Sequence, residues 1–180
     1  PTHFQDLGTR NAIDSALKRH TRSGTIRRLA QGLYDYPRSH ASLGLLSPSI
    51  DTLARALAGR DATRLQPSGA YAANLLGLSD QVPMKVMFLT DGTPRSVRIG
   101  QQTITLKRTT PKNMATAGRI SGLMIQALRY LGSRHVDESV ISILSKHLTD
   151  ADKAQLLKDI AYAPAWIADI IHRIARPPNS

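Results

Sequence analysis

Apolar residues recur with helical spacing near the start of the chain. Three of them, Ile13, Ala16 and Leu17, stand at positions i, i+3 and i+4, so one side of a helix here would be apolar. Thr9 precedes this stripe as a capping residue, and Gly24 follows it where a left-handed glycine ends a helix. The pattern therefore predicts a helix that begins after Thr9 and ends before Gly24.

The period of the pattern changes from helical to strand-like after this helix. Segments 25–29 and 33–36 are rich in β-branched and aromatic residues, and the pair Gln31-Gly32 between them predicts the turn of a hairpin. Pro37 closes this unit. The next segment, 38–50, shows no clear period and contains Ser, Gly and Pro, which predicts a linker. We therefore expect a first domain over residues 1–38.

Residues 48–180 form the second predicted domain, in which helices are heavily represented. Strands are expected within 85–110, where Asp91-Gly92 resembles a hairpin turn. Ser68 is expected to cap a helix rather than to act as a nucleophile, because it lacks the G-x-S-x-G context. The expected helices cover 49–58, 68–76, 118–131, 136–148, 150–160 and 164–175. The predicted fold class is α+β, with a small antiparallel sheet followed by a C-terminal helical bundle.

The chain is strongly basic. Its 180 residues include 24 Lys and Arg against 13 Asp and Glu, which gives a net charge of +11. Basic residues are densest over 10–28, where six of them accompany a single acid, Asp14. Neutralising phosphates releases condensed counterions, so such a segment favours binding to a polyanion. The alternative is a solvated surface that keeps the protein soluble.

Cysteine is absent, and no apolar run is long enough to cross a bilayer. A chain without cysteine has neither a disulfide nor a thiolate zinc site, which fits the reducing cytoplasm, where we place the protein. We expect no membrane partner.

The first unit has the layout of a winged helix-turn-helix, in which a basic helix is followed at once by a basic hairpin. A B-DNA major groove admits one helix, while the hairpin contacts the adjacent backbone or minor groove. Such a motif needs an earlier helix, and only PTHFQDLG precedes Thr9, so we expect its first helix to lie outside this sequence. Protein interaction is the alternative use of the motif. The expected DNA contacts are Arg10, Asn11, Ser15, Lys18, Arg19, Arg22, Arg27 and Arg28.

Three stretches, AIDSALKRHTRSGTIRRLAQGLYDYP, LQPSGAYAANLLGLSDQVP and FLTDG, resemble the AbiEi-type antitoxins of bacterial type IV toxin–antitoxin systems. The resemblance implies a repressor that binds inverted repeats in the double-stranded DNA of its own promoter. It also implies that the rest of the chain counteracts a cognate nucleotidyltransferase toxin, usually without a stable complex. The alternative is a protein-interaction module that sequesters a toxin directly.

A second basic stretch lies within 105–119 and contains Lys107, Arg108, Lys112 and Arg119. It is either a solvated strand end and loop, or a surface for RNA, DNA or an acidic partner. Three other side chains, Gln66, Tyr71 and Asn74, are candidates for a recognition surface.

Motifs for catalysis and cofactor binding are missing from the sequence. No two histidines have H-x-x-x-H spacing, and there is no P-loop and no dinucleotide-binding glycine pattern. Asp150 and Asp152 stand at the start of a predicted helix, where negative charge stabilises the helix dipole. We therefore expect a protein that is not an enzyme and that has no metal or cofactor. Trp166 lies on a strongly apolar helix, where its side chain either packs in the core or lines a groove that binds a partner.

Overall fold

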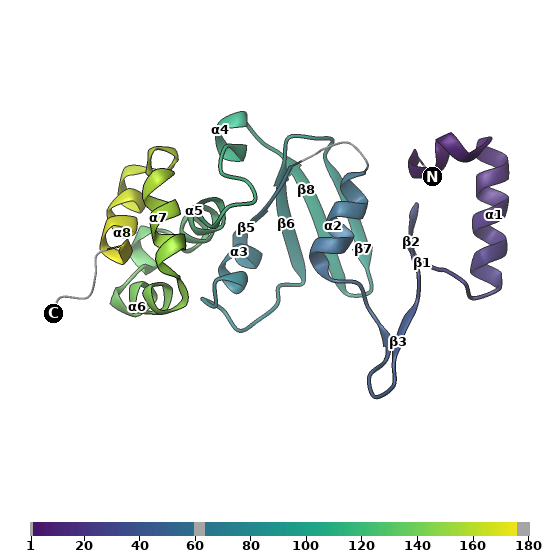
Figure 1. Cartoon of the computed structure of the whole chain (residues 1–180), viewed down its shortest axis with the longest axis horizontal. Helices are drawn as coiled ribbons and strands as arrows, with labels where there is room; N and C mark the ends of the chain where they lie inside the picture. The colour runs from purple at the N-terminus through teal and green to yellow at the C-terminus, as the bar shows by residue number, and fades with distance from the viewer. Residues whose placement is uncertain (1, 60–63, 176–180) are drawn as a thin grey trace.

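A computed structural model of the chain describes residues 2–59 and 64–175. Its helices and strands form a mixed α+β arrangement with the helical bundle at one end, a sheet in the middle and a separate helix at the other end (Figure 1). The predicted α+β class is confirmed at this level.

Four strands form the central sheet: β5 (Leu65–Ser68), β6 (Lys85–Thr90), β7 (Arg95–Ile99) and β8 (Gln102–Arg108), in the order β5-β6-β8-β7. The pairs β5–β6 and β7–β8 are antiparallel, but β6 and β8 run parallel. The sheet is therefore mixed, and the prediction of an antiparallel sheet is wrong in this respect. The Asp91-Gly92 turn leads from β6 to β7, which are not neighbours in the sheet, so it does not close a hairpin.

One face of the sheet is covered by α2 (Ile50–Ala58), which packs Leu53 and Ala54 against strand residues such as Phe88 and Leu106. The side chain of Ser49 caps this helix, as its position in the sequence predicted. The helix α3 (Gly69–Leu75) follows β5 directly and contributes Tyr71 to the same core as α2. It also packs against α5 (Ile120–Leu131). Ser68 precedes α3 but does not cap it, because its hydroxyl donates to Gln126 Oε1 at 3.2 Å instead.

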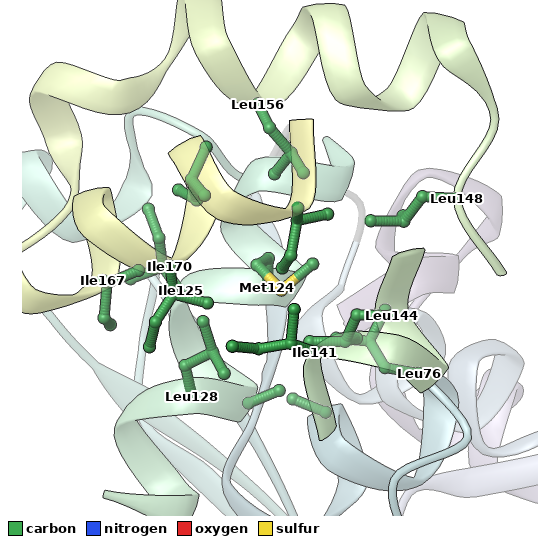
Figure 2. Packing of buried hydrophobic residues seen from close by; sticks show 14 of the residues in the cluster. Leu76, Met124, Ile125, Leu128, Ile141, Leu144, Leu148, Leu156, Ile167 and Ile170 are labelled. Atoms are coloured by element: carbon green, nitrogen blue, oxygen red, sulfur yellow. The ribbon is translucent and has the colours of Figure 1, made fainter. Parts of the chain in front are cut away.

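The C-terminal bundle consists of α5 (Ile120–Leu131), α6 (Glu138–His147), α7 (Asp150–Lys158) and α8 (Ala165–Ala175), joined by the short helices η2 (Ser133–His135) and η3 (Ile160–Tyr162). Figure 2 shows Met124 of α5 in the middle of their apolar side chains. Asp137 caps α6, and Thr149 and Asp152 form a capping box on α7. Trp166 is partly buried against this core, as expected for packing. The short helix α4 (Pro111–Met114) connects the sheet to the bundle.

The N-terminal part begins with the 3-10 helix η1 (Thr2–Leu7), followed by α1 (Arg10–Arg22) with Thr9 as its cap. Strands β1 (Arg27–Ala30) and β2 (Leu33–Asp35) form the predicted hairpin, with Gln31 and Gly32 at its turn. Leu33 is buried in the same core as α2 and the sheet, so the hairpin packs toward the sheet, whereas α1 packs against η1.

A second hairpin, β3 (Arg38–His40) and β4 (Gly44–Leu46), occupies the segment predicted to be a linker, and that prediction is wrong. It extends from the middle of the molecule in Figure 1. Its strands have only three residues each, and Leu43 and Leu45 remain exposed. Strands this short, with no buried face, leave no alternating pattern in the sequence, which is why the segment resembled a linker.

Candidate nucleic-acid interface

The helix α1 is anchored by its apolar side. Ile13 is buried, and a cavity of about 460 Å³ lies between this side and η1, lined by Phe4, Leu7, Ala12, Ile13, Ala16, Leu17 and His20. Arg19, His20 and Arg22 stand in the last turn, where positive charge complements the C-terminal end of the helix dipole. The apolar residues thus fix which side of α1 faces outward.

The opposite side of α1 carries a stripe of polar residues, Asn11, Ser15, Lys18 and Arg22, which we call the polar stripe. Their spacing of four, three and four residues aligns them along one side of a helix. All four are exposed, and Arg10 and Arg19, which flank them, are exposed too. Within residues 2–59 and 64–175, none of the six has a side-chain hydrogen bond or ion pair. The stripe is therefore available to an external partner.

The two arginines of the hairpin have different surroundings. Arg27 Nη2 lies 2.7 Å from Asp35 Oδ2 on the partner strand and donates to the Leu46 carbonyl at 2.5 Å. Arg28 is exposed, and its Nε donates only to the Ala30 carbonyl, at 3.3 Å. Alternation along the strand directs the two side chains to opposite faces of the hairpin. Of the eight residues predicted to contact DNA, Arg27 alone is engaged with an acidic side chain in the part of the chain that the structure describes.

The residues of the second basic stretch are separated by the fold. Lys107 and Arg108 are consecutive in β8 and therefore point to opposite faces of the sheet. Arg119 forms an ion pair with Asp159, 2.7 Å between Nη1 and Oδ1, and Lys112 lies exposed on α4. These four residues do not form one patch.

Lys107 lies instead on an open face of the sheet, the face opposite α2. Strand pairing aligns Lys85 with Thr103 and Arg98 in one row, and Met87 with Thr105 and Ser96 in the next. Lys85, Arg98 and Lys107 are all exposed. Lys85 and Arg98 were not predicted as part of this surface, because their proximity to Lys107 depends on the parallel pairing of β6 with β8.

The residues Gln66 and Tyr71, predicted to line a recognition surface, are buried, so that prediction is wrong for both. Tyr71 donates its hydroxyl hydrogen to Asp51 Oδ2 at 2.7 Å, and burial, reinforced by this bond and by the charge of Asp51, raises the pKa of the tyrosine. Asn74 is half-buried and donates to the Ser79 carbonyl at 2.8 Å. These side chains hold the fold together.

Neither a metal-ligand cluster nor a membrane-spanning helix occurs among the described residues. No cluster of three or more His, Cys, Asp or Glu side chains there could hold a metal ion. Nor does any helix in that part of the chain have the length and apolar character to cross a membrane.

The arrangement of the fold defines an α+β protein with an exposed basic helix at one end. The model of DUF6088, described as a family of unknown function, matches residues 1–156, and the chain therefore belongs to this family. Neither the curated proteins nor the solved structures compared with the chain gave a match.

Proposed function

We propose that this protein is a DNA-binding antitoxin that represses its own promoter. In this proposal α1 is the recognition helix, and the hairpin β1–β2 is the wing of a winged helix-turn-helix. The polar stripe of α1 is the observation that supports it most directly, because four polar side chains are aligned, exposed and unpaired opposite an apolar side. Promoter binding would require the protein to be in the cytoplasm.

The chemistry of the polar stripe fits duplex DNA. A helix with its side chains is about 10–12 Å across, which suits a major groove about 12 Å wide. Asn11 and Ser15 can exchange hydrogen bonds with base edges, while Lys18 and Arg22 neutralise phosphates. Arg28 is the hairpin arginine with a free guanidinium face, so it is the one assigned to the DNA backbone or minor groove.

The antitoxin part of the proposal rests on the resemblance to AbiEi-type proteins, which covers most of the chain. The sheet and the helical bundle would counteract a nucleotidyltransferase toxin without forming a stable complex with it. The open face of the sheet, with Lys85, Arg98 and Lys107, is a surface on which this part of the chain could bind the nucleic acid that such a toxin modifies.

A gel-shift titration with the native upstream promoter at several salt concentrations tests the DNA-binding proposal. We expect log affinity to fall linearly with log salt, by about 0.9 for each phosphate contacted. Lys18→Ala should weaken binding to all sequences and reduce this slope, whereas Asn11→Ala should change sequence preference. Lys146→Ala is the matched control, because Lys146 is exposed on α6 at the other end of the molecule. Absence of promoter binding, or equal weakening by Lys18→Ala and Lys146→Ala, would refute the proposal.

A second candidate function, direct sequestration of a toxin, is favoured by the apolar tip of the β3–β4 hairpin. Leu43 and Leu45 are 71% and 64% exposed there. Exposed apolar groups of this kind are typical of protein interfaces. Co-expression with the product of a neighbouring nucleotidyltransferase gene separates the two functions. A complex that survives gel filtration in the wild type, and is lost in a Leu43→Ser/Leu45→Ser variant, would favour sequestration.

A further inference from the structure

A cavity of about 620 Å³ lies where α2, β5 and the start of α5 meet. Among the residues that the structure describes, three arginines, Arg55, Arg64 and Arg119, and one carboxylate, that of Asp51, line it. Pockets that hold small organic molecules usually have volumes of about 300–1,000 Å³. The cavity therefore has the size for such a ligand, and it offers several guanidinium groups as hydrogen-bond donors.

Two of the arginines are held in place by carboxylates. Arg64 Nε lies 2.8 Å from Asp91 Oδ2, and its Nη1 donates to the Met114 carbonyl at 3.2 Å. Arg119 Nη1 lies 2.7 Å from Asp159 Oδ1. A guanidinium has five N–H donors, so each keeps donors for a ligand after these bonds are made. Because the side chains of Arg64 and Arg119 are already ordered, the binding of a ligand costs less side-chain conformational entropy.

The third arginine is free. Arg55 stands one helical turn after Asp51 on α2, is exposed, and has no hydrogen bond or ion pair with any residue that the structure describes. The first turn of α5 already has a carboxylate beside it, because Ser121 donates to Asp159 Oδ2 at 2.6 Å. The free donors of the three guanidinium groups favour an anion with several oxygens, which is the chemistry of a phosphate.

The rest of the cavity is mostly apolar. The apolar lining comes from the strands and from the helices on either side: Leu65, Pro67, Phe88, Leu75, Ile120 and Leu123.

We propose that this cavity binds a mononucleotide. Its phosphate lies among Arg55, Arg64 and Arg119, and its base lies between the apolar walls. None of these residues belongs to the polar stripe of α1. A failure of nucleotide binding would therefore not contradict promoter binding, and a failure of promoter binding would not contradict nucleotide binding.

Isothermal titration calorimetry on the full chain tests the site with AMP, GMP, CMP and UMP, one at a time. Inorganic phosphate and the four nucleosides without phosphate serve as comparison ligands. We expect at least one nucleotide to bind about tenfold or more tightly than inorganic phosphate and than its own nucleoside, since both halves of the ligand are recognised. If none of the four nucleotides binds, or if phosphate or the nucleoside alone binds as tightly, the proposal is overturned.

Two arginine variants assign the binding to this cavity. Arg55→Ala should weaken nucleotide binding about tenfold or more, because it removes charged hydrogen bonds to the phosphate. Arg134→Ala removes the same charge from an exposed position on η2 and should change affinity by less than about twofold, as expected for a distant exposed charge. Thermal melts establish that both variants are folded. Equal affinities of the two variants would place the nucleotide elsewhere and refute the site.

Discussion

The helix α1 and the helix α5 are both amphipathic, but their apolar sides are covered to different extents. In α5, Met124 and Leu128 are fully buried among residues from α3, α6, α7 and α8. In α1, Ile13 is buried, yet Ala16 and Leu17 are only half-buried, and the neighbour that packs against them is the short η1. The same sequence pattern thus gives a core element at one end of the molecule and an outward-facing helix at the other.

The polar groups of the two regions differ in the same way. In the bundle, Asp159 is buried and receives hydrogen bonds from Ser121, Gln155 and Arg119. In α1 the cations of the polar stripe are exposed and unpaired in the described structure. Polar residues of the bundle therefore contribute to folding, while those of α1 are free to bind a partner.

The largest expected effect comes from truncating the bundle core. Leu128 has no exposed surface, so Leu128→Ala should lower the free energy of unfolding by about 2–5 kcal/mol through lost burial and the cavity left behind. Leu17→Ala makes the same chemical change on half-buried α1, where about 1 kcal/mol or less is expected because less surface is lost. Urea unfolding followed by circular dichroism measures both. Similar losses would show that α1 is as tightly packed as the bundle.

A smaller effect is expected from the buried carboxylate. Burial by itself would raise the pKa of Asp159, but the hydrogen bonds from Ser121 and Gln155 and the charge of Arg119 together outweigh it, so the pKa lies below its usual range. Asp159→Asn removes the charge from these bonds and should lower the free energy of unfolding by about 1–3 kcal/mol at neutral pH. Asp169→Asn, at an exposed position of α8, is the charge-matched control.

The same carboxylate should make stability depend on pH in a defined direction. Because its pKa is lower in the folded than in the unfolded chain, its contribution is complete above about pH 4, the usual range for aspartate, and is lost as pH falls through the folded pKa. Unfolding midpoints measured from pH 6 down to pH 3 should therefore fall less steeply in Asp159→Asn than in the wild type. Identical slopes would mean that the bonds to Asp159 do not favour its charged form.

Local structure could be predicted from the sequence where it depends on nearby residues. The bounds of α1 and α2 follow from Thr9 and Ser49 as caps and from the apolar spacing behind them, all within a dozen residues. The parallel pairing of β6 with β8 joins segments separated by β7, and no local pattern encodes it. Consequently the mixed sheet, and the open face on which Lys107 lies beside Lys85 and Arg98, could not be predicted.

The same limit applies to individual charges in the candidate interface. Arg27 and Arg28 are adjacent in the sequence and were predicted to have the same role. Their difference comes from Asp35 and the Leu46 carbonyl, which reach Arg27 only after two hairpins have formed. A sequence shows where cations are concentrated, but the fold decides which of them are already paired.

These two arginines give the smallest but most selective prediction. Arg27→Ala breaks a partly buried ion pair, 29% and 15% exposed at its two side chains, and should lower the free energy of unfolding by about 1 kcal/mol. Arg28→Ala should change it by less than about 0.5 kcal/mol, as is usual for an exposed residue without a specific partner. In the promoter gel shift the order should reverse, because Arg28 has the free guanidinium, so Arg28→Ala should cause the greater loss of affinity. If Arg27→Ala instead reduced affinity more while leaving stability unchanged, the Asp35 pair would be dispensable, and Arg27 would be the arginine that leaves the hairpin to bind DNA.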